Sequence, residues 1–202
     1  MLKWSRSYKS QSAADFNKGA GQIGGDVYVE LDFTTGDIFF NLTKKYRRYV
    51  INCVNEHVAE SLRSFKTANY EVYKKTCDRV FGKFGDIRTK DAYDKFKSWF
   101  NKECFGNDKC DKILRGFYFH ILSNASLSSL QKFDESGFVQ EWGHRSLELT
   151  EDQYEEIHTI LRERAPIIVS QDPLAVHDRY SDENTLFVSS SNLELGGKVY
   201  KT

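Results

Sequence analysis

The segment Gly24-Gly25-Asp26-Val27-Tyr28-Val29-Glu30 sets the fold class, because a pair of glycines leads directly into a short apolar run. Valine and tyrosine are enriched in strands, and a run of this length bounded by glycines is typical of a buried strand. Helical spacing follows over residues 36–45, where the apolar side chains on one face are Ile38, Phe39 and Leu42. We therefore expect a strand at 26–30 and then a helix.

The same alternation repeats along the chain. Residues 49–53, Tyr-Val-Ile-Asn-Cys, predict a second strand, and residues 56–66 predict a second helix with Val58 and Leu62 facing inward. Strands that alternate with helices at this spacing are typical of a parallel sheet.

The pattern between residues 70 and 128 is helical and rich in aromatic side chains. We interpret these side chains as the core of a helical subdomain and not as a surface on which bases stack. The lysines between them are typical of a solvated helix face. The aromatic residues are Phe81, Phe84, Tyr93, Phe96, Trp99, Phe100, Phe117, Tyr118 and Phe119, and the lysines are Lys95, Lys97, Lys102, Lys109 and Lys112.

The last part of the chain returns to strands and helices. Thr150 and Gln153 fit a capping box, which starts a helix whose inner stripe is Ile157, Ile160 and Leu161. Strands are expected at 166–170 and 184–189. The predicted fold is therefore α/β, with a Rossmann-like sheet of about four parallel strands and flanking helices. Residues 1–66 and 147–202 form this core, and residues 67–146 form a helical insertion subdomain.

Composition limits the function classes. The 202 residues contain 29 Lys and Arg and 29 Asp and Glu, so the formal net charge is zero and a dedicated nucleic-acid binder is not favoured. No apolar run reaches membrane-spanning length, and the first residues lack the apolar core of a signal peptide. We expect a protein of the cytoplasm or nucleus, or one packaged into a virion from an intracellular pool.

The four cysteines do not predict a metal site. Cys104 and Cys110 are close enough in sequence to suggest zinc, but His57 and His120 lie at no matching interval. We expect free thiols at all four positions, the other two being Cys53 and Cys77.

Several motifs, in order, resemble those of Dam-like DNA adenine methyltransferases. They are Leu2-Lys3-Trp4-Ser5, Tyr28-Val29-Glu30, Phe39-Phe40-Asn41-Leu42, Val50 to Asn55 and Asp178 to Phe187. Members of this family transfer a methyl group from S-adenosylmethionine to the exocyclic amine of adenine. The resemblance covers nearly the whole chain and implies a methyltransferase-like sheet with a target-recognition-like insertion.

The resemblance also implies where the cofactor would bind. The positions that match the family's cofactor site are Lys3, Trp4, Glu30, Gly36 and Asp172. The family's opening glycines and lysine fall on Arg6, Ser7 and Tyr8, and its glycine-rich turn reads Leu31-Asp32-Phe33-Thr34-Thr35-Gly36. Threonine is poor at the close backbone approach that glycine allows. Cys53 replaces the acid that holds the ribose, and a thiol is a weak acceptor. We expect a vestigial pocket with no cofactor.

The catalytic motif of the family, Asp-Pro-Pro-Tyr, falls on Ser190, Ser191, Asn192 and Leu193. A serine is a neutral, weaker acceptor for the target amine, and leucine offers no ring to stack on a flipped base. The family's Asn-Arg pair, whose arginine is suited to a phosphate contact, becomes Ser123-Asn124. These departures predict a pseudoenzyme with no catalytic residues.

In the family, the strand that matches 185–189 lies beside the first strand and is covered by later strands. Here only Glu194 to Thr202 follow the motif, so we expect strand 185–189 to be a sheet edge. An uncovered edge attracts another chain. The sequence therefore predicts a protein partner or a homo-oligomer at 185–189.

Three functions follow from this reading. The first is a structural or interaction module, for example a minor capsid protein or other virion component, because Dam-like enzymes are common in phages and large DNA viruses. The second is a non-catalytic DNA-binding factor, which predicts that Lys44, Lys45, Arg47 and Arg48 cluster with the lysines of the insertion. The third is a regulatory subunit of an active DNA methyltransferase.

Overall fold

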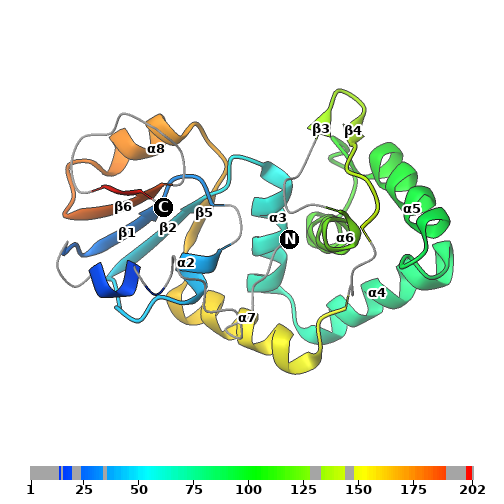
Figure 1. Cartoon of the computed structure of the whole chain (residues 1–202), viewed down its shortest axis with the longest axis horizontal. Coiled ribbons are helices and arrows are strands. Elements are labelled where there is room, and N and C mark those ends of the chain that lie inside the picture. Colours follow the sequence, from blue (N-terminus) through cyan, green and yellow to red (C-terminus); the bar gives the residue numbers. More distant parts are fainter. Residues whose placement is uncertain are drawn as a thin grey trace. The chain divides into compact units, whose positions relative to one another are not determined.

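The computed structural model describes residues 14, 16–19, 24–33, 36–127, 133–143, 148–189 and 199–201 of the chain. The chain divides into two compact units (Figure 1). The helical unit is Glu60–His158, and the sheet unit is formed by Lys3–Ala59 and Thr159–Thr202. The chain passes from one unit to the other inside helices α3 (Glu56–Thr67) and α7 (Glu151–Arg164). The sequence predicts these boundaries between residues 66 and 67 and between residues 146 and 147. Both helices enter the helical unit because Phe65 and Tyr154 pack there, with ring centroids 5.2 Å apart.

The described part of the sheet unit contains five parallel strands. They are β1 (Val27–Glu30), β2 (Arg48–Asn52), β5 (Ile167–Val169), β6 (Thr185–Ser189) and β7 (Val199–Lys201), in the order β5-β2-β1-β6-β7. The α/β fold with a parallel, Rossmann-like sheet is therefore confirmed. The strand order reverses at β1. The next strand along the chain, β2, lies on one side of β1, and the much later strand β6 lies on the other.

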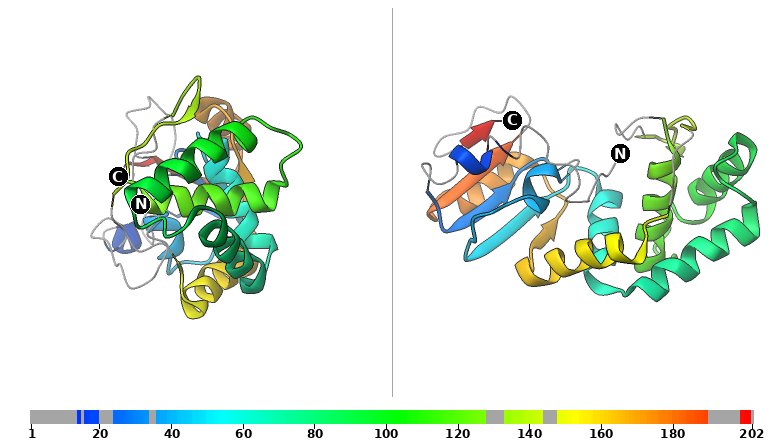
Figure 2. Two further views of the ribbon diagram at one scale, coloured as in Figure 1. Left: turned by 90° about the vertical axis from the view of Figure 1, so that its right-hand side faces the viewer. Right: turned by 60° about the horizontal axis from the view of Figure 1, so that its bottom comes forward.

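The expectation that strand 185–189 is a sheet edge is wrong. Strand β6 lies between β1 and β7, with Phe187 opposite Val29 on one side and opposite Val199 on the other. The right-hand view of Figure 2 shows β7 beside β6. All five residues of β6 are buried, and β7 pairs with it on the side away from β1. The predicted partner site at 185–189 therefore loses its basis.

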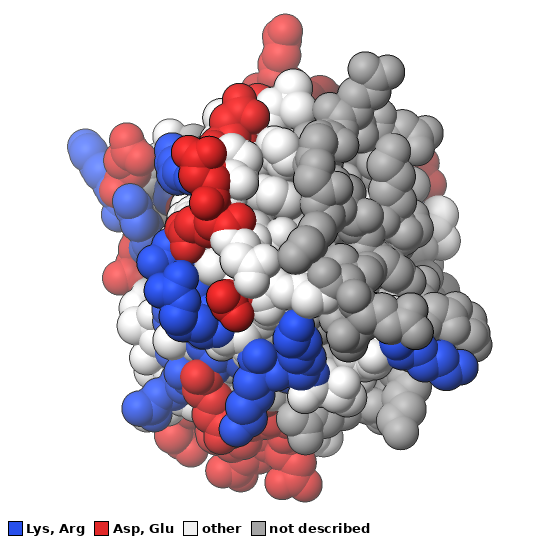
Figure 3. Space-filling model, turned by 90° about the vertical axis from the view of Figure 1, so that its left-hand side faces the viewer, with Lys and Arg blue, Asp and Glu red and all other residues white. Residues whose placement is uncertain are grey.

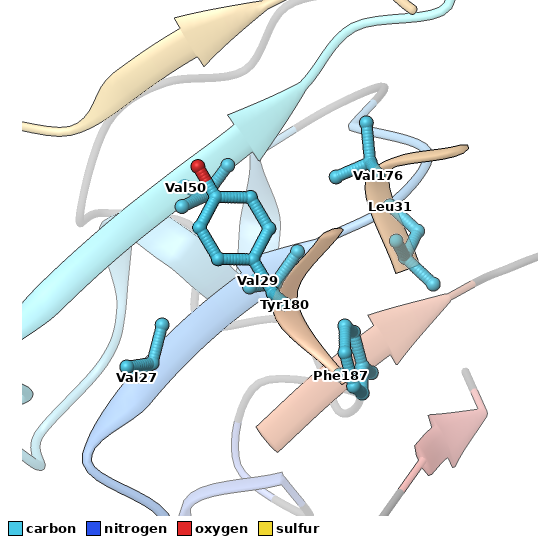
Figure 4. Close-up of a cluster of buried hydrophobic side chains, with 7 residues drawn as sticks. All are labelled: Val27, Val29, Leu31, Val50, Val176, Tyr180 and Phe187. Atoms are coloured by element: carbon cyan, nitrogen blue, oxygen red, sulfur yellow. The ribbon is translucent and has the colours of Figure 1, made fainter. Parts of the chain in front are cut away.

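The two faces of β1 carry different side chains, as a period of two requires. Val27, Val29 and Leu31 pack toward helix α8 (Pro173–Tyr180), which contributes Val176 and Tyr180 to the same apolar cluster (Figure 4). On the other face, Tyr28 packs into an aromatic group with centroid distances of 5.5–6.3 Å. The group consists of Phe16, Phe39, Tyr46 and Tyr49.

Helix α2 (Asp37–Phe40) is shorter than the helix expected over 36–45. The Asn41 side chain donates to Asp37 O (2.8 Å), and the Arg164 guanidinium donates to the carbonyls of Phe39 and Leu42. These side chains hydrogen-bond the backbone carbonyls that would accept backbone N–H groups in a longer helix, so the helix ends after one turn. The three apolar residues expected on its inner face are nevertheless buried.

The helical unit is built from α4 (Tyr70–Phe84), α5 (Lys90–Glu103), α6 (Lys112–Ala125) and the hairpin β3 (Phe133–Asp134) and β4 (Gly137–Phe138), seen in the left-hand view of Figure 2. Of the nine aromatic residues singled out in the sequence, six are buried and Phe81, Phe84 and Trp99 are half-buried, so their role as a core is confirmed. Helix α6 crosses α3 closely at Gly116, where a Cβ atom would lie 2.6 Å from Glu60 O. Among the helices in the described ranges, none combines the length and apolarity needed to cross a membrane.

Candidate functional site

The carboxyl edge of β1, β2, β5 and β6 is the candidate site, because ligands of open parallel sheets bind outside the carboxyl ends of the strands where the strand order reverses. Each strand delivers a polar residue or a polar loop to this edge. The described residues here are Glu30, Asp32, Asn52, Cys53, Gln171, Asp172 and Ser189.

Asn52, the last residue of β2, ties two neighbouring loops together. Its Nδ2 donates to Leu31 O (2.8 Å) after β1 and to Gln171 O (3.0 Å) after β5, while its Oδ1 accepts from Gln171 N (3.0 Å). The side chain is fully buried. Its amide therefore hydrogen-bonds the protein's own backbone at the place where a ligand would approach the sheet.

Replacing Asn52 with leucine should lower the free energy of unfolding by about 2 kcal/mol, because the substitution leaves the buried carbonyl of Leu31 and the partly buried backbone groups of Gln171 without partners. Urea unfolding followed by circular dichroism measures the loss. Gln171→Ala is the matched control, since Gln171 contributes only backbone atoms to the bridge and its side chain is exposed. Equal stability of Asn52→Leu and the unmodified chain would contradict the bridging role.

Aromatic rings pack against Gly36, which lies after β1. Gly36 has φ 74°, and a Cβ atom there would lie 2.7 Å from the rings of Phe33 and Phe40. Phe33 is only 3% exposed, and its backbone N donates to Asn52 O (2.8 Å). The left-handed conformation explains why glycine stands at this position. Thr34 and Thr35 lie outside the described residues.

Glu30 is a buried carboxyl group with a tyrosine partner. Tyr28 Oη donates to Glu30 Oε2 (2.6 Å), and both side chains lie on the same face of β1. The pKa of Glu30 is raised from 4.5 to about 7, chiefly by burial; the Tyr28 hydrogen bond opposes this rise, and the nearby Asp32 and Asp37 add to it. Burial and the neighbouring Glu30 also raise the pKa of Tyr28 well above its ordinary value.

The other residues discussed at this edge are placed as follows. Asp172 is the N-cap of α8, and its Oδ2 accepts from Ala175 N (3.2 Å). Cys53 is fully buried, and its backbone N donates to Val169 O (2.9 Å). Ser189 Oγ donates to Asp32 Oδ2 (3.3 Å), which links the ends of β6 and β1. Lys3, Trp4 and the degenerate motif at 190–193 lie outside the described residues.

A second polar region lies in the helical unit. A shallow groove of about 500 Å³ runs between α5 and the β3–β4 hairpin. Asn101 fastens the hairpin to α5, because its side chain both donates to Phe138 O and accepts from Phe138 N at 2.9 Å. Lys97 Nζ lies 3.5 Å from Asp94 Oδ1. The groove is lined by Lys97, Ser98, Asn101, Lys102, Ser136, Phe138 and Val139.

Basic side chains are paired with acidic neighbours at many positions of the described chain. Arg47 and Arg48 both contact Glu183, at 3.4 and 2.7 Å. Lys95 contacts Asp91 at 2.6 Å in the helical unit. On the face drawn in Figure 3, lysines and arginines lie interspersed with aspartates and glutamates. Each of these acidic neighbours offsets the positive charge that its basic partner would offer to a phosphate backbone.

The cysteines are free thiols, as expected from the sequence. Within the described ranges, no group of three or more His, Cys, Asp or Glu side chains is arranged to hold a metal ion.

Sequence reasoning missed the Asn52 bridge, the Tyr28–Glu30 pair and the Asp172 cap. Each had a signal. An asparagine inside an apolar strand needs buried partners. Tyr28 and Glu30 are two residues apart and therefore share a face. Asp172 precedes Pro173, which is the residue order expected at a helix start.

Comparison of the chain with protein-family models and with curated proteins found no match. The functional proposal therefore depends on the residues and the geometry described above.

Proposed function

We propose that this chain is a catalytically inactive, methyltransferase-like α/β protein with a structural or interaction role. The observation that carries the proposal is the carboxyl edge of the sheet, where the polar side chains of Asn52, Glu30 and Asp172 make hydrogen bonds within the chain itself. Binding a ligand through Asn52 or Glu30 requires breaking buried hydrogen bonds, which costs free energy, whereas the hydrogen bond of Asp172 is exposed.

The side chains at this edge are a poor match for S-adenosylmethionine. The ribose of that cofactor needs a strong acceptor, and Cys53 supplies only a thiol that is fully buried. The ring of Phe33 lies against Gly36, at the end of the turn whose glycines, in a binding loop, would let the backbone approach the ligand. These features support a vestigial pocket, and with it the absence of a bound cofactor.

An interaction role is supported by exposed apolar side chains around β5, which ends the strand order. Ile167 in this strand is 44% exposed, and the nearby loop and helix residues Val54 and Leu174 are 65% and 45% exposed. Exposed apolar residues at a sheet edge are typical of protein contacts. This surface replaces strand 185–189 as the expected contact for a protein partner or a second copy of the chain.

The role we favour is that of a component of an assembly inside the cell or in a virion, such as a minor capsid protein. The alternative role is that of a regulatory subunit of an active DNA methyltransferase, which requires the fold but no catalytic activity. Native mass spectrometry of the protein isolated from its natural source separates these roles. A large particle supports the first, and a complex with an active methyltransferase supports the second.

The pseudoenzyme proposal predicts no methyl transfer and no cofactor binding. The purified chain should leave adenine-containing duplex DNA unlabelled when supplied with methyl-labelled S-adenosylmethionine, whereas an active adenine methyltransferase labels it in a parallel reaction. Calorimetric titration with the cofactor should show no heat of binding. Labelled adenine would overturn the proposal, and micromolar cofactor binding without labelling would overturn its vestigial-pocket part.

A second candidate, a non-catalytic DNA-binding factor, is favoured by one observation. The groove of the helical unit places two lysines beside serine and asparagine side chains, which are groups that contact phosphates. Fluorescence anisotropy with duplex DNA at low salt tests it. Binding that weakens steeply with salt and is lost in Lys97→Glu/Lys102→Glu, but kept in Lys95→Glu, supports this function. No binding at low salt excludes it.

A further inference from the structure

Two cysteine thiols meet at the junction of α5 and α6 in the helical unit. Cys104 follows the last residue of α5, Cys110 precedes the N-cap of α6, and their sulfur atoms are 3.1 Å apart. A disulfide brings two sulfurs to about 2 Å, so bond formation needs an approach of only about 1 Å. The pair is a property of the helical unit alone and is independent of the proposed function.

The backbones that carry these thiols are fixed by hydrogen bonds. Cys104 N donates to Phe100 O (2.9 Å) at the end of α5, and Cys110 N donates to Asn107 O (3.1 Å). Asp111 then caps α6 by accepting from the backbones of Ile113 and Leu114. The thiols are therefore held together by two anchored helix ends and not by a chance approach of mobile side chains.

The two thiols differ in exposure. Cys104 is 1% exposed, whereas Cys110 is partly exposed to solvent. Burial, together with the hydrogen bond to Cys110, raises the pKa of Cys104, while the Arg115 guanidinium acts in the opposite direction and Glu103 adds to the rise. An external reagent therefore reaches Cys110 first, and Cys104 is placed to react second.

We propose that Cys104 and Cys110 form an oxidisable dithiol that reacts with small disulfides of the glutathione class. The Cys110 thiolate attacks one sulfur of the small disulfide, forms a mixed disulfide and releases one small thiol. Cys104 then loses its proton and attacks Cys110 Sγ, which closes the protein disulfide and releases the second small thiol. Two protein thiols are oxidised, and one small disulfide is reduced to two thiols.

The bond would lock a loop that supports the core of the unit. Asn107 lies between the two cysteines, and its carbonyl accepts from Arg115 Nη1 (2.8 Å). Arg115 in turn holds the buried carboxylate of Glu60 on α3. Oxidation therefore links the end of α5 covalently to the start of α6 next to this ion pair, and reduction removes the link.

The test uses the full folded chain incubated with oxidised glutathione at mildly alkaline pH, then blocked with iodoacetamide and mapped without reduction. We expect the loss of two hydrogen atoms and a Cys104–Cys110 disulfide. Cys53 and Cys77, both buried, serve as internal controls that remain unmodified by glutathione. Closing this short loop should also raise the Tm by about 5 °C.

Two variants test the order of reaction. Cys104→Ala should accumulate glutathione on Cys110, and Cys110→Ser should leave Cys104 unmodified in the folded chain. The proposal is overturned if the unmodified chain keeps both thiols alkylatable after oxidation, or if it stops at a stable mixed disulfide. It is also overturned if the bond forms only in urea, or if its formation lowers the Tm.

Discussion

Replacing Arg115 with alanine should lower the free energy of unfolding of the helical unit by about 3–5 kcal/mol, because the substitution leaves a buried carboxylate without its guanidinium. Arg115 Nε donates to Glu60 Oε2 (2.8 Å), Nη2 contacts Glu60 Oε1, and Nη1 donates to Asn107 O (2.8 Å). The side chains of Arg115 and Glu60 are 7% and 3% exposed, so water cannot replace the lost contacts. Urea unfolding followed by circular dichroism measures the change.

Two controls separate the buried charge from the loss of packing. Lys95→Ala removes one partner of an exposed pair with Asp91, and it should change stability by less than about 0.5 kcal/mol. The double variant Glu60→Leu/Arg115→Met removes both charges and keeps apolar volume, so it should recover most of the stability lost in Arg115→Ala. A double variant as unstable as the single one would show that the charge is not the cause.

The sequence predicted those parts of the fold that depend on local periodicity. The glycine-bounded run became β1, the capping box at Thr150 and Gln153 formed with both of its hydrogen bonds, and the aromatic residues of the middle segment formed a core. Each is decided by residues within a few positions of one another. The helical unit accordingly follows its pattern more closely than the sheet does.

The parts that were missed depend on residues far apart in the chain. The pairing of β6 with β7 cannot be seen in a three-residue strand, and the end of α2 is set by Arg164, which lies far along the sequence. The hydrogen bonds of the candidate site could not be predicted for the same reason. Asn52 acquires its role only when the loops after β1 and β5 meet beside it. The resemblance to methyltransferases predicted cofactor-site residues at this edge, but it did not predict which polar groups hydrogen-bond one another there.

Glu30 should make the sheet unit less stable as pH rises, which is the reverse of the usual effect of a carboxyl group. Its pKa is about 7 in the folded chain against an ordinary value of 4.5, so between these values the folded state holds a proton that the unfolded state has released. The stabilisation is complete below pH 4.5 and is lost as pH rises through 7, with a total of about 3 kcal/mol. Urea unfolding at pH 4.5 and pH 8 measures this loss.

Glu30→Gln isolates this effect from other titrating groups. Glutamine keeps the shape and the acceptor for Tyr28 Oη but carries no charge, so the variant should match the unmodified chain at pH 4.5 and exceed it by about 3 kcal/mol at pH 8. The difference between the two proteins cancels the opposite contribution of His120, whose pKa is lowered by burial to about 3 and which therefore favours folding as pH rises toward 6.5. Glu155→Gln, on the exposed face of α7, should show no such difference. If Glu30→Gln is less stable than the unmodified chain by the same amount at both pH values, then Glu30 is ionised in the folded state, and the carboxyl edge of β1 holds a charge that a cationic ligand group can pair with.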